Sequence, residues 1–302
     1  MQRIGLLILG VIAGAAGTGA AQQAAGTTLW RVAATTLAVP PALATGPAAT
    51  FWNPAQTEDS SRAQIGIEAI QTPAAIGASG MLGAVRVPLR SLGGGYIGLV
   101  YGRVGLSDLT RTTDSPDPDG SSVPFYTFAL GATWARTISA TSVGATLAFH
   151  ETRLDASRAD HWTIDVGASR TILGDRFRVA AATHFFSSLS ATDPSQDIYA
   201  GVEANLWEGP LWGGRATLRG RYGLAFAHGF NADHQLGLGA ELARTVALDV
   251  AVVREGSYSE AGWRPVAGLR VAIGKYRVTL ARDAGVNDVG SAYRVGVDAR
   301  FQ

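Results

Sequence analysis

Apolar side chains occupy every second position in successive segments of about ten residues from Arg62 onward. This period of two is typical of a β-strand whose two faces meet different environments, because neighbouring side chains on a strand point to opposite faces. Helical periodicity is weak throughout this region. In the clearest segment, one face carries Tyr126, Phe128, Leu130, Ala132 and Trp134, and the other carries Thr127, Ala129, Gly131 and Thr133.

Such segments number about fourteen between Arg62 and Phe301, and bacterial single-chain barrels have an even number of strands. The connections alternate between long and short, which is the asymmetry of external loops and periplasmic turns. Residues 62–302 are therefore predicted to form an all-β, transmembrane antiparallel β-barrel; a soluble all-β protein, such as a lipocalin-like barrel or a propeller, is the alternative. Long connections are predicted at 105–123, 151–160 and 187–197, and short ones at 136–139, 172–176 and 207–211.

The composition agrees with strands that have one apolar face and one polar face. Hydrophobic residues make up 47% of the 302 residues, yet the mean hydropathy is only +0.13, Gly numbers 38 and charged residues are 16%. This is too polar for a helical membrane protein. The formal net charge of +1 gives no basic excess for nucleic-acid binding. The absence of Cys excludes disulfides and thiolate metal sites.

The N-terminus, residues 1–21, has the pattern of a cleavable signal peptide. Arg3 supplies a positive charge, residues 4–16 form an apolar run, and Gly19, Ala20 and Ala21 form a small-residue cleavage site. The alternative is a membrane anchor, but the apolar run is shorter than the roughly 20 residues of a spanning helix. We therefore expect an exported protein from which this segment has been removed.

The last predicted strand ends on an aromatic residue. It resembles the C-terminal signal read by the outer-membrane assembly machinery, in which alternating apolar residues finish on an aromatic. We therefore expect an integral protein of the bacterial outer membrane, with outer-membrane lipid and the assembly machinery as partners. The residues of this signal are Tyr293, Val295, Val297, Ala299 and Phe301.

Residues 22–61 lack the period of two and form a separate N-terminal segment. Within it, Pro54 disfavours helix at Asn53, and an Asn side chain can bond the backbone two residues on in an Asx turn. Such a turn is either an ordinary lead into the barrel or a constriction inside it. The motif consists of Phe51, Trp52, Asn53, Pro54 and Ala55.

With this motif, the sequence resembles the FadL-like superfamily of outer-membrane barrels, whose mature N-termini carry Asn-Pro-Ala shortly before the first strand. The Trp-Asn-Pro-Ala form is similar to that of the PorV/PorQ-like branch. The resemblance implies a barrel of about 14 strands with residues 22–61 as a plug in the lumen. It also implies passive transport of small hydrophobic compounds across the outer membrane. The alternative function is an accessory role in type IX protein secretion and surface attachment, with secretion-system proteins as partners.

Neither a Gly-x-Ser-x-Gly elbow nor a Gly-x-x-x-x-Gly-Lys phosphate loop occurs in the sequence. We therefore expect neither enzymatic activity nor a cofactor. The glycines are explained as kinks and turns of the barrel. The five histidines are expected near external strand ends and have no nucleophile paired with them, so they are interpreted as exposed rim groups: His150, His161, His184, His228 and His234.

Charged residues of both signs fall on the predicted lumen face. They form either a polar pathway or a salt-bridged filling of the lumen. The high cost of an unpaired buried charge favours the salt-bridged filling. Three acidic residues in the longest loop, Asp114, Asp117 and Asp119, are a candidate calcium site, with a solvated Pro-rich turn as the alternative. The lumen-facing set comprises Glu68, Arg86, Asp165, Glu203, Arg219, Arg221, Glu241, Asp249, Arg270, Arg277 and Asp298.

Overall fold

The computed structural model describes residues 25–56, 61–89, 95–107, 109–111, 122–174, 176–186, 196–227, 231–256, 262–285 and 290–301. The predicted signal peptide lies outside these residues. No helix among them is long and apolar enough to cross a membrane.

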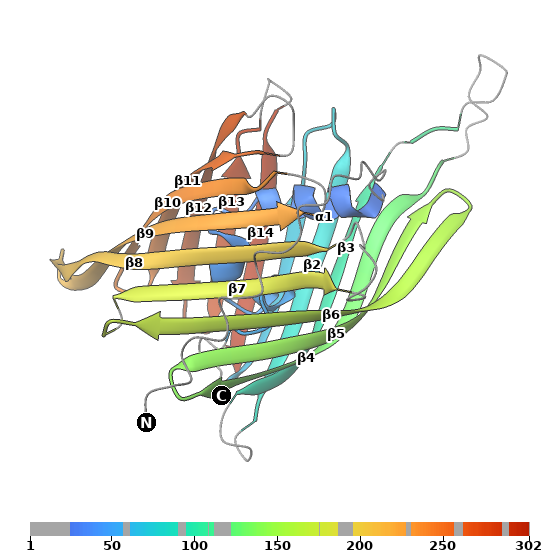
Figure 1. The fold of residues 1–302 in the computed structure, drawn as a ribbon. Helices are drawn as coiled ribbons and strands as arrows, with labels where there is room; N and C mark the ends of the chain where they lie inside the picture. Colours follow the sequence, from blue (N-terminus) through green and yellow to red (C-terminus); the bar gives the residue numbers. More distant parts are fainter. Residues whose placement is uncertain are drawn as a thin grey trace.

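The described residues form a closed antiparallel barrel (Figure 1), in which each strand pairs with its neighbours in sequence and β1 pairs with β14. This confirms the predicted all-β barrel of fourteen strands. The strands are β1 (Ala63–Gln71), β2 (Ala78–Pro88), β3 (Tyr96–Leu106), β4 (Phe125–Ile138), β5 (Thr141–Leu154), β6 (Ser157–Ile172), β7 (Phe177–Phe186), β8 (Asp197–Leu211), β9 (Gly214–Ala227), β10 (Asp233–Leu242), β11 (Val246–Arg254), β12 (Trp263–Ile273), β13 (Tyr276–Asp283) and β14 (Ala292–Phe301).

The alternation in sequence becomes an alternation of environment in the wall. In β4, Leu130 and Trp134 are exposed on the outside, whereas Thr127 and Thr133 are buried on the inside. Thr133 bonds to Thr146 on the neighbouring strand at 2.7 Å, so inward polar groups find partners within the lumen. The outer surface is consequently apolar along the strands, and the polar groups lie inside.

The connections separate the barrel into two ends. The short-turn end carries residues 89–95, 139–140, 173–176, 212–213, 243–245 and 274–275. The long-loop end carries residues 72–77, 107–124, 155–156, 187–196, 228–232, 255–262 and 284–291. At several short turns, successive residues with positive φ, such as Leu173 and Gly174, give the backbone twist that joins adjacent strands tightly.

Two predicted connections are wrong. The predicted long loop at 151–160 is strand, because β5 and β6 stay paired as far as a two-residue turn at 155–156, with Arg158 bonded to Glu151 at 2.9 Å. The predicted short turn at 207–211 also lies in a strand. There the register shifts between Asn205 and Trp207, and pairing with β9 continues to a turn at 212–213. Figure 1 shows this β8–β9 hairpin reaching beyond its neighbours.

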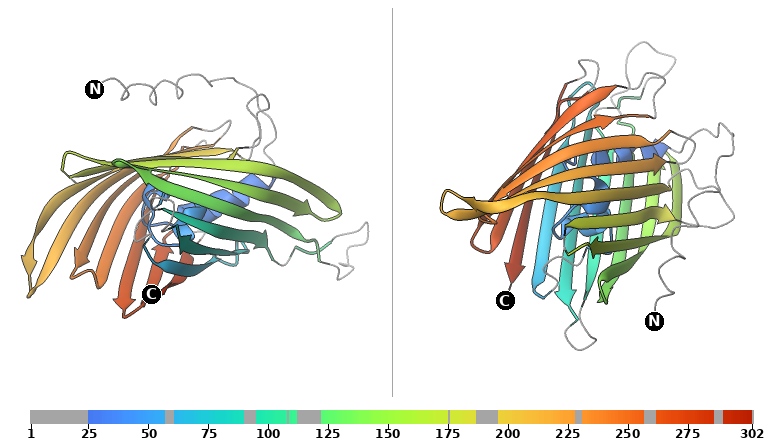
Figure 2. Two further views of the ribbon diagram at one scale, coloured as in Figure 1. Left: turned by 90° about the horizontal axis from the view of Figure 1, so that it is seen from below. Right: turned by 60° about the vertical axis from the view of Figure 1, so that its left-hand side comes forward.

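Residues 25–56, here called the inner segment, pack against inward-facing residues of the wall (Figure 2). They form α1 (Ala25–Thr35) and two single turns, η1 (Pro41–Leu43) and η2 (Ala48–Phe51). The buried side of α1 carries Leu29, Trp30 and Ala33, with the spacing of one helix face. The core of the molecule therefore lies between this segment and the wall rather than within a sheet sandwich.

An arginine introduced on the outer face tests the inward and outward assignment. Leu130→Arg places a charge on an apolar, outward position of β4, where it should cost roughly 2–4 kcal/mol near the bilayer midplane. Thr171→Arg adds the same charge on the lumen side, beside open space. Urea titration in lipid vesicles, followed by heat-modifiable gel mobility, should show a large loss of stability for Leu130→Arg alone. Equal losses would contradict the assignment.

Candidate functional site: the segment inside the barrel

The inner segment depends on the wall for hydrogen-bond partners, because the ends of its short helices and the stretches between them leave backbone groups without helical partners. Wall arginines donate to its carbonyl groups at four points along its length. Arg264 donates to Thr35 O at 3.1 Å and Arg86 to Gln56 O at 2.7 Å. The other two bonds run from Arg294 to Ala33 O and from Arg178 to Leu43 O. The arginines thus attach the segment to the wall from its helix to its last residue.

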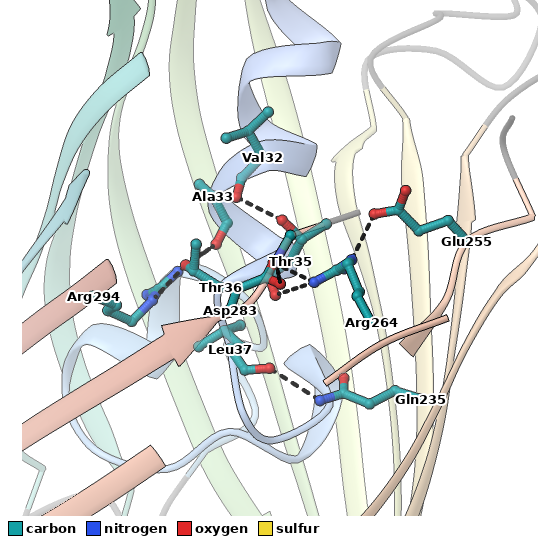
Figure 3. A network of polar contacts seen from close by, with 11 residues as sticks. Val32, Ala33, Thr35, Thr36, Leu37, Gln235, Glu255, Arg264, Asp283 and Arg294 are labelled. Atoms are coloured by element: carbon teal, nitrogen blue, oxygen red, sulfur yellow. Dashed lines mark hydrogen bonds and ion pairs between the residues drawn. The ribbon is translucent and has the colours of Figure 1, made fainter. Parts of the chain in front are cut away.

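Figure 3 shows two of these arginines around the C-terminal end of α1. Arg294 on β14 bonds Glu68 of the wall and also donates to Thr36 Oγ1 at 3.0 Å. Arg264 on β12 bonds the wall carboxylates of Glu255, at 2.8 Å, and Asp283. Cations at this position complement the partial negative charge of a helix C-terminus and satisfy carbonyls that lack intrahelical partners.

On α1 itself, Arg31 pairs with Asp233 of β10 at 2.6 Å. Burial lowers the pKa of Arg31, but the carboxylates of Asp233 and Asp197 more than offset this effect and raise the pKa above its ordinary value. Arg31 therefore remains a cation and ties the helix to β10.

The Phe51–Ala55 motif forms the turn that the sequence suggests. The Asn53 side chain accepts a bond from Ala55 N at 2.9 Å, as in an Asx turn, and donates to Ala42 O at 2.8 Å. Tyr96 of β3 donates its hydroxyl to Pro54 O at 2.6 Å. The motif is buried, so one Asn side chain holds two parts of the inner segment together inside the barrel.

An aromatic cluster fills the space beside the motif. Trp30 and Phe51 have ring centroids 5.0 Å apart, and Trp30 Nε1 donates to His150 Nε2 at 3.1 Å. The ring centroid of His184 lies 5.0 Å from that of Phe51, edge to face, and 5.5 Å from that of Trp52. The cluster joins the inner segment to β5 and β7 through close apolar packing.

The placement of these two histidines corrects the interpretation from sequence. His150 and His184 are buried within the aromatic cluster, and are not rim groups. Strand alternation points both inward, and the inner segment brings Trp30 and Phe51 against them. His161 is half-buried with its ring 5.1 Å from that of His150, and His234 bonds Tyr222 at 2.7 Å. His228 lies outside the described residues.

Several glycines of the wall face the inner segment along its length. The sequence alone explains these glycines as kinks and turns and does not predict this contact. A Cβ atom added at Gly102 would lie 2.6 Å from the Phe51 ring, and one at Gly268 would lie 2.8 Å from the Ala38 side chain. The sequence shows that these glycines occupy inward strand positions. It does not show that the inner segment packs against them. The full set of facing pairs is Gly66 with Pro47, Gly102 with Phe51, Gly144 with Pro54, Gly167 with Asn53, Gly201 with Leu43, Gly223 with Pro40 and Gly268 with Ala38.

The predicted lumen-facing charged residues lie in strands, and their side chains are buried or half-buried. Each one bonds other groups, and a triad forms where Arg221 joins Glu203 at 2.6 Å and Asp249. This arrangement is that of a salt-bridged filling. The sequence interpretation had not singled out Arg264 or Asp283, which lie at strand ends. The remaining contacts are Arg219 to Glu241 (3.1 Å), Arg277 to Asp298 (2.9 Å), Arg270 to Thr45 (2.8 Å), Phe185 N to Asp165 (2.6 Å), Arg294 to Glu68, and Arg86 to Gln64.

The predicted calcium residues Asp114, Asp117 and Asp119 lie outside the described residues. Within the described part of the chain, no group of three or more His, Asp or Glu side chains is placed to hold a metal ion.

The cavities on the two sides of the inner segment differ greatly in volume. Beside α1, a gap lined by Arg31, Asp197 and Tyr199 has a volume of about 40 Å³. Toward the short-turn end, a cavity of about 780 Å³ lies between the wall and the segment residues Val39 and Leu43. The inner segment therefore separates a closely packed region from a spacious vestibule.

No family model matches the sequence, and no curated protein matches it. Among solved structures, the Acinetobacter baumannii outer membrane protein Omp33 is similar at 9% identity and a TM-score of 0.48, over 80% of this chain and 98% of that one. An engineered variant of the Rh. blastica porin has 10% identity and a TM-score of 0.42, over 79% and 99% of the two chains. CdiB from Acinetobacter baumannii has 9% identity and a TM-score of 0.43, over 80% and 60%. These likenesses are too low to assign a family or a function.

Filling one of the wall glycines should loosen the inner segment without unfolding the barrel. A Cβ atom at Gly144 would collide with backbone atoms of Pro54 and Ala55, and overpacking of this kind costs roughly 1–3 kcal/mol. We expect Gly144→Val to speed trypsin cleavage after Arg31 by about tenfold or more, since roughly 1.4 kcal/mol corresponds to a factor of ten.

The matched control is Gly83→Val on the outer face, where an added Cβ meets only a backbone oxygen at 3.5 Å. Mass spectrometry of the digest identifies the Arg31–Val32 cut, and heat-modifiable mobility checks the barrel. Equal cleavage rates in the wild type and Gly144→Val would show that the segment is not held against this glycine.

Proposed function

We propose that the protein is an integral barrel of the bacterial outer membrane, exported with a signal peptide, and that it conducts solutes when the inner segment is displaced. The outward-facing apolar residues support a membrane position, since they would otherwise expose a large apolar surface to water. The closed pairing of β1 with β14 supports it as well, because a barrel without an edge satisfies its backbone inside lipid.

The observation that carries the gating proposal is the way the inner segment is attached. The segment contributes no strand to the wall in the described residues, so it can leave while every pair of neighbouring strands stays intact. Its attachments are side-chain hydrogen bonds and packing, and each bond to a charged group contributes roughly 1.5–3 kcal/mol. Several such bonds keep the closed state dominant, so opening needs a ligand or partner that favours the open state.

The resemblance of the Trp52-Asn53-Pro54-Ala55 motif to FadL-like barrels supports a small hydrophobic compound as the solute. The aromatic cluster agrees with this choice, because displacement of Trp30 and Phe51 would leave apolar surface facing the passage. A PorV/PorQ-like role in type IX secretion is the second candidate. The firmly attached segment favours it, since a barrel that holds a partner protein needs no open lumen.

Removal of the inner segment separates the two candidates. Deletion of residues 25–56 with the signal peptide retained should leave a heat-modifiable, folded barrel, because the salt bridges within the wall remain. In planar bilayers, the deletion variant should show stable conductance several times that of the full-length protein. A folded variant with unchanged conductance would exclude gating by this segment and leave the secretion role as the better candidate.

A further inference from the structure

The cavity at the short-turn end, here called the basic vestibule, is lined mainly by cations. Nine arginines and Lys275 face it, against the carboxylates of Glu203 and Glu241. Two more carboxylates, Asp249 and Asp298, bond arginines of this set from just behind the lining. Among the described residues, ten cations therefore meet four carboxylates, an excess of about six positive charges.

The excess charge is not spread evenly through the vestibule. Its deep arginines are the ones that bond carboxylates, as Arg219 does with Glu241 and Arg221 with Glu203. At the mouth, Arg62, Arg176 and Arg244 have exposed side chains, and none has a carboxylate within salt-bridge distance among the described residues. The mouth of the vestibule consequently carries positive charge that no group of the described chain neutralises.

The shape of the vestibule strengthens this charge. A cavity with low-dielectric walls and one sign of charge concentrates the electric field and raises the local concentration of counter-ions. Guanidinium groups also match carboxylate and phosphate oxygens with two parallel hydrogen bonds. The volume of about 780 Å³ lies within the range of small-molecule sites. Arginines scattered over an open surface would not be enclosed in this way.

We propose that the basic vestibule binds a small, multiply charged anion of the polycarboxylate or phosphate type. The proposal rests on the proposed function in one respect: the anion is a ligand, separate from the hydrophobic solute, that reaches the vestibule from the short-turn side while the inner segment is in place. The floor residues Val39 and Leu43 belong to the inner segment, so a bound anion lies directly against the element that has to move.

Isothermal titration of the full-length mature protein with citrate, in a neutral detergent at low ionic strength, tests the proposal. The triple variant R62Q/R176Q/R244Q should weaken citrate binding at least about tenfold, because three positive charges that line the vestibule are lost. Arg254→Gln, an exposed arginine at the long-loop end, is the control and should leave binding unchanged. Gel mobility with and without heating confirms that all three proteins are folded.

Titration with inorganic pyrophosphate should rank the affinities of the wild type and the two variants in the same order. The same order for both ligands would show a general anion site and not a site for one carboxylate compound. Equal citrate affinities in the wild type and the triple variant, or no binding by the wild type at millimolar citrate, would overturn the proposal. A signal that appears only when anionic phospholipid is added would assign the arginines to lipid headgroups and also overturn it.

Failure of this proposal and failure of the gated channel are distinguishable, because citrate binding is measured with the inner segment in place. Binding that depends on Arg62, Arg176 and Arg244, combined with unchanged conductance on deletion of residues 25–56, would retain the anion site and reject the channel. The opposite combination would retain the channel and reject the site.

Discussion

A backbone that crosses a lipid bilayer must satisfy its amide and carbonyl groups within the protein, since lipid offers no hydrogen-bond partners. The wall meets this constraint by closing β1 onto β14, so that it has no free edge. The inner segment cannot meet it in the same way, because between its short helices it has no regular hydrogen bonding. Wall arginines supply the missing donors, and the Asn53 side chain supplies one acceptor and one donor within the segment. The rest of the lumen is arranged around these bonds.

Two of the four arginines that bond the segment also pair with carboxylates of the wall. Arg294 joins Glu68 as well as α1, and Arg264 joins Asp283 and Glu255 as well as Thr35. A buried guanidinium without any partner would be costly, but these groups retain a carboxylate when the segment is absent. These two pairs therefore persist when the segment leaves, whereas Asp233 of the wall loses its partner Arg31.

The wall could be predicted from sequence because each strand has an apolar outer face and a polar inner face, which imposes the period of two on residues such as Leu130 and Thr133. The lengths of the β5–β6 and β8–β9 hairpins could not be predicted from sequence. How far each hairpin continues depends on pairing with the partner strand and, in β8, on the register shift at Trp207, and not on which face of the strand is apolar. His150 and Gly102 have inward positions that the sequence shows. Their roles depend on Trp30 and Phe51, which lie more than fifty positions away from them in the chain.

The position of the inner segment is the central claim, and an engineered disulfide tests it directly because the chain contains no Cys. In Ala38→Cys/Gly268→Cys, the two Cβ atoms start 2.8 Å apart and need only a small shift to reach the usual disulfide separation of roughly 3.5–4.5 Å. The account predicts that peptide mapping of the protein from outer membranes finds residue 38 linked to residue 268. Free thiols at both positions, each labelled by a membrane-impermeant maleimide at the rate of an exposed cysteine, would contradict it.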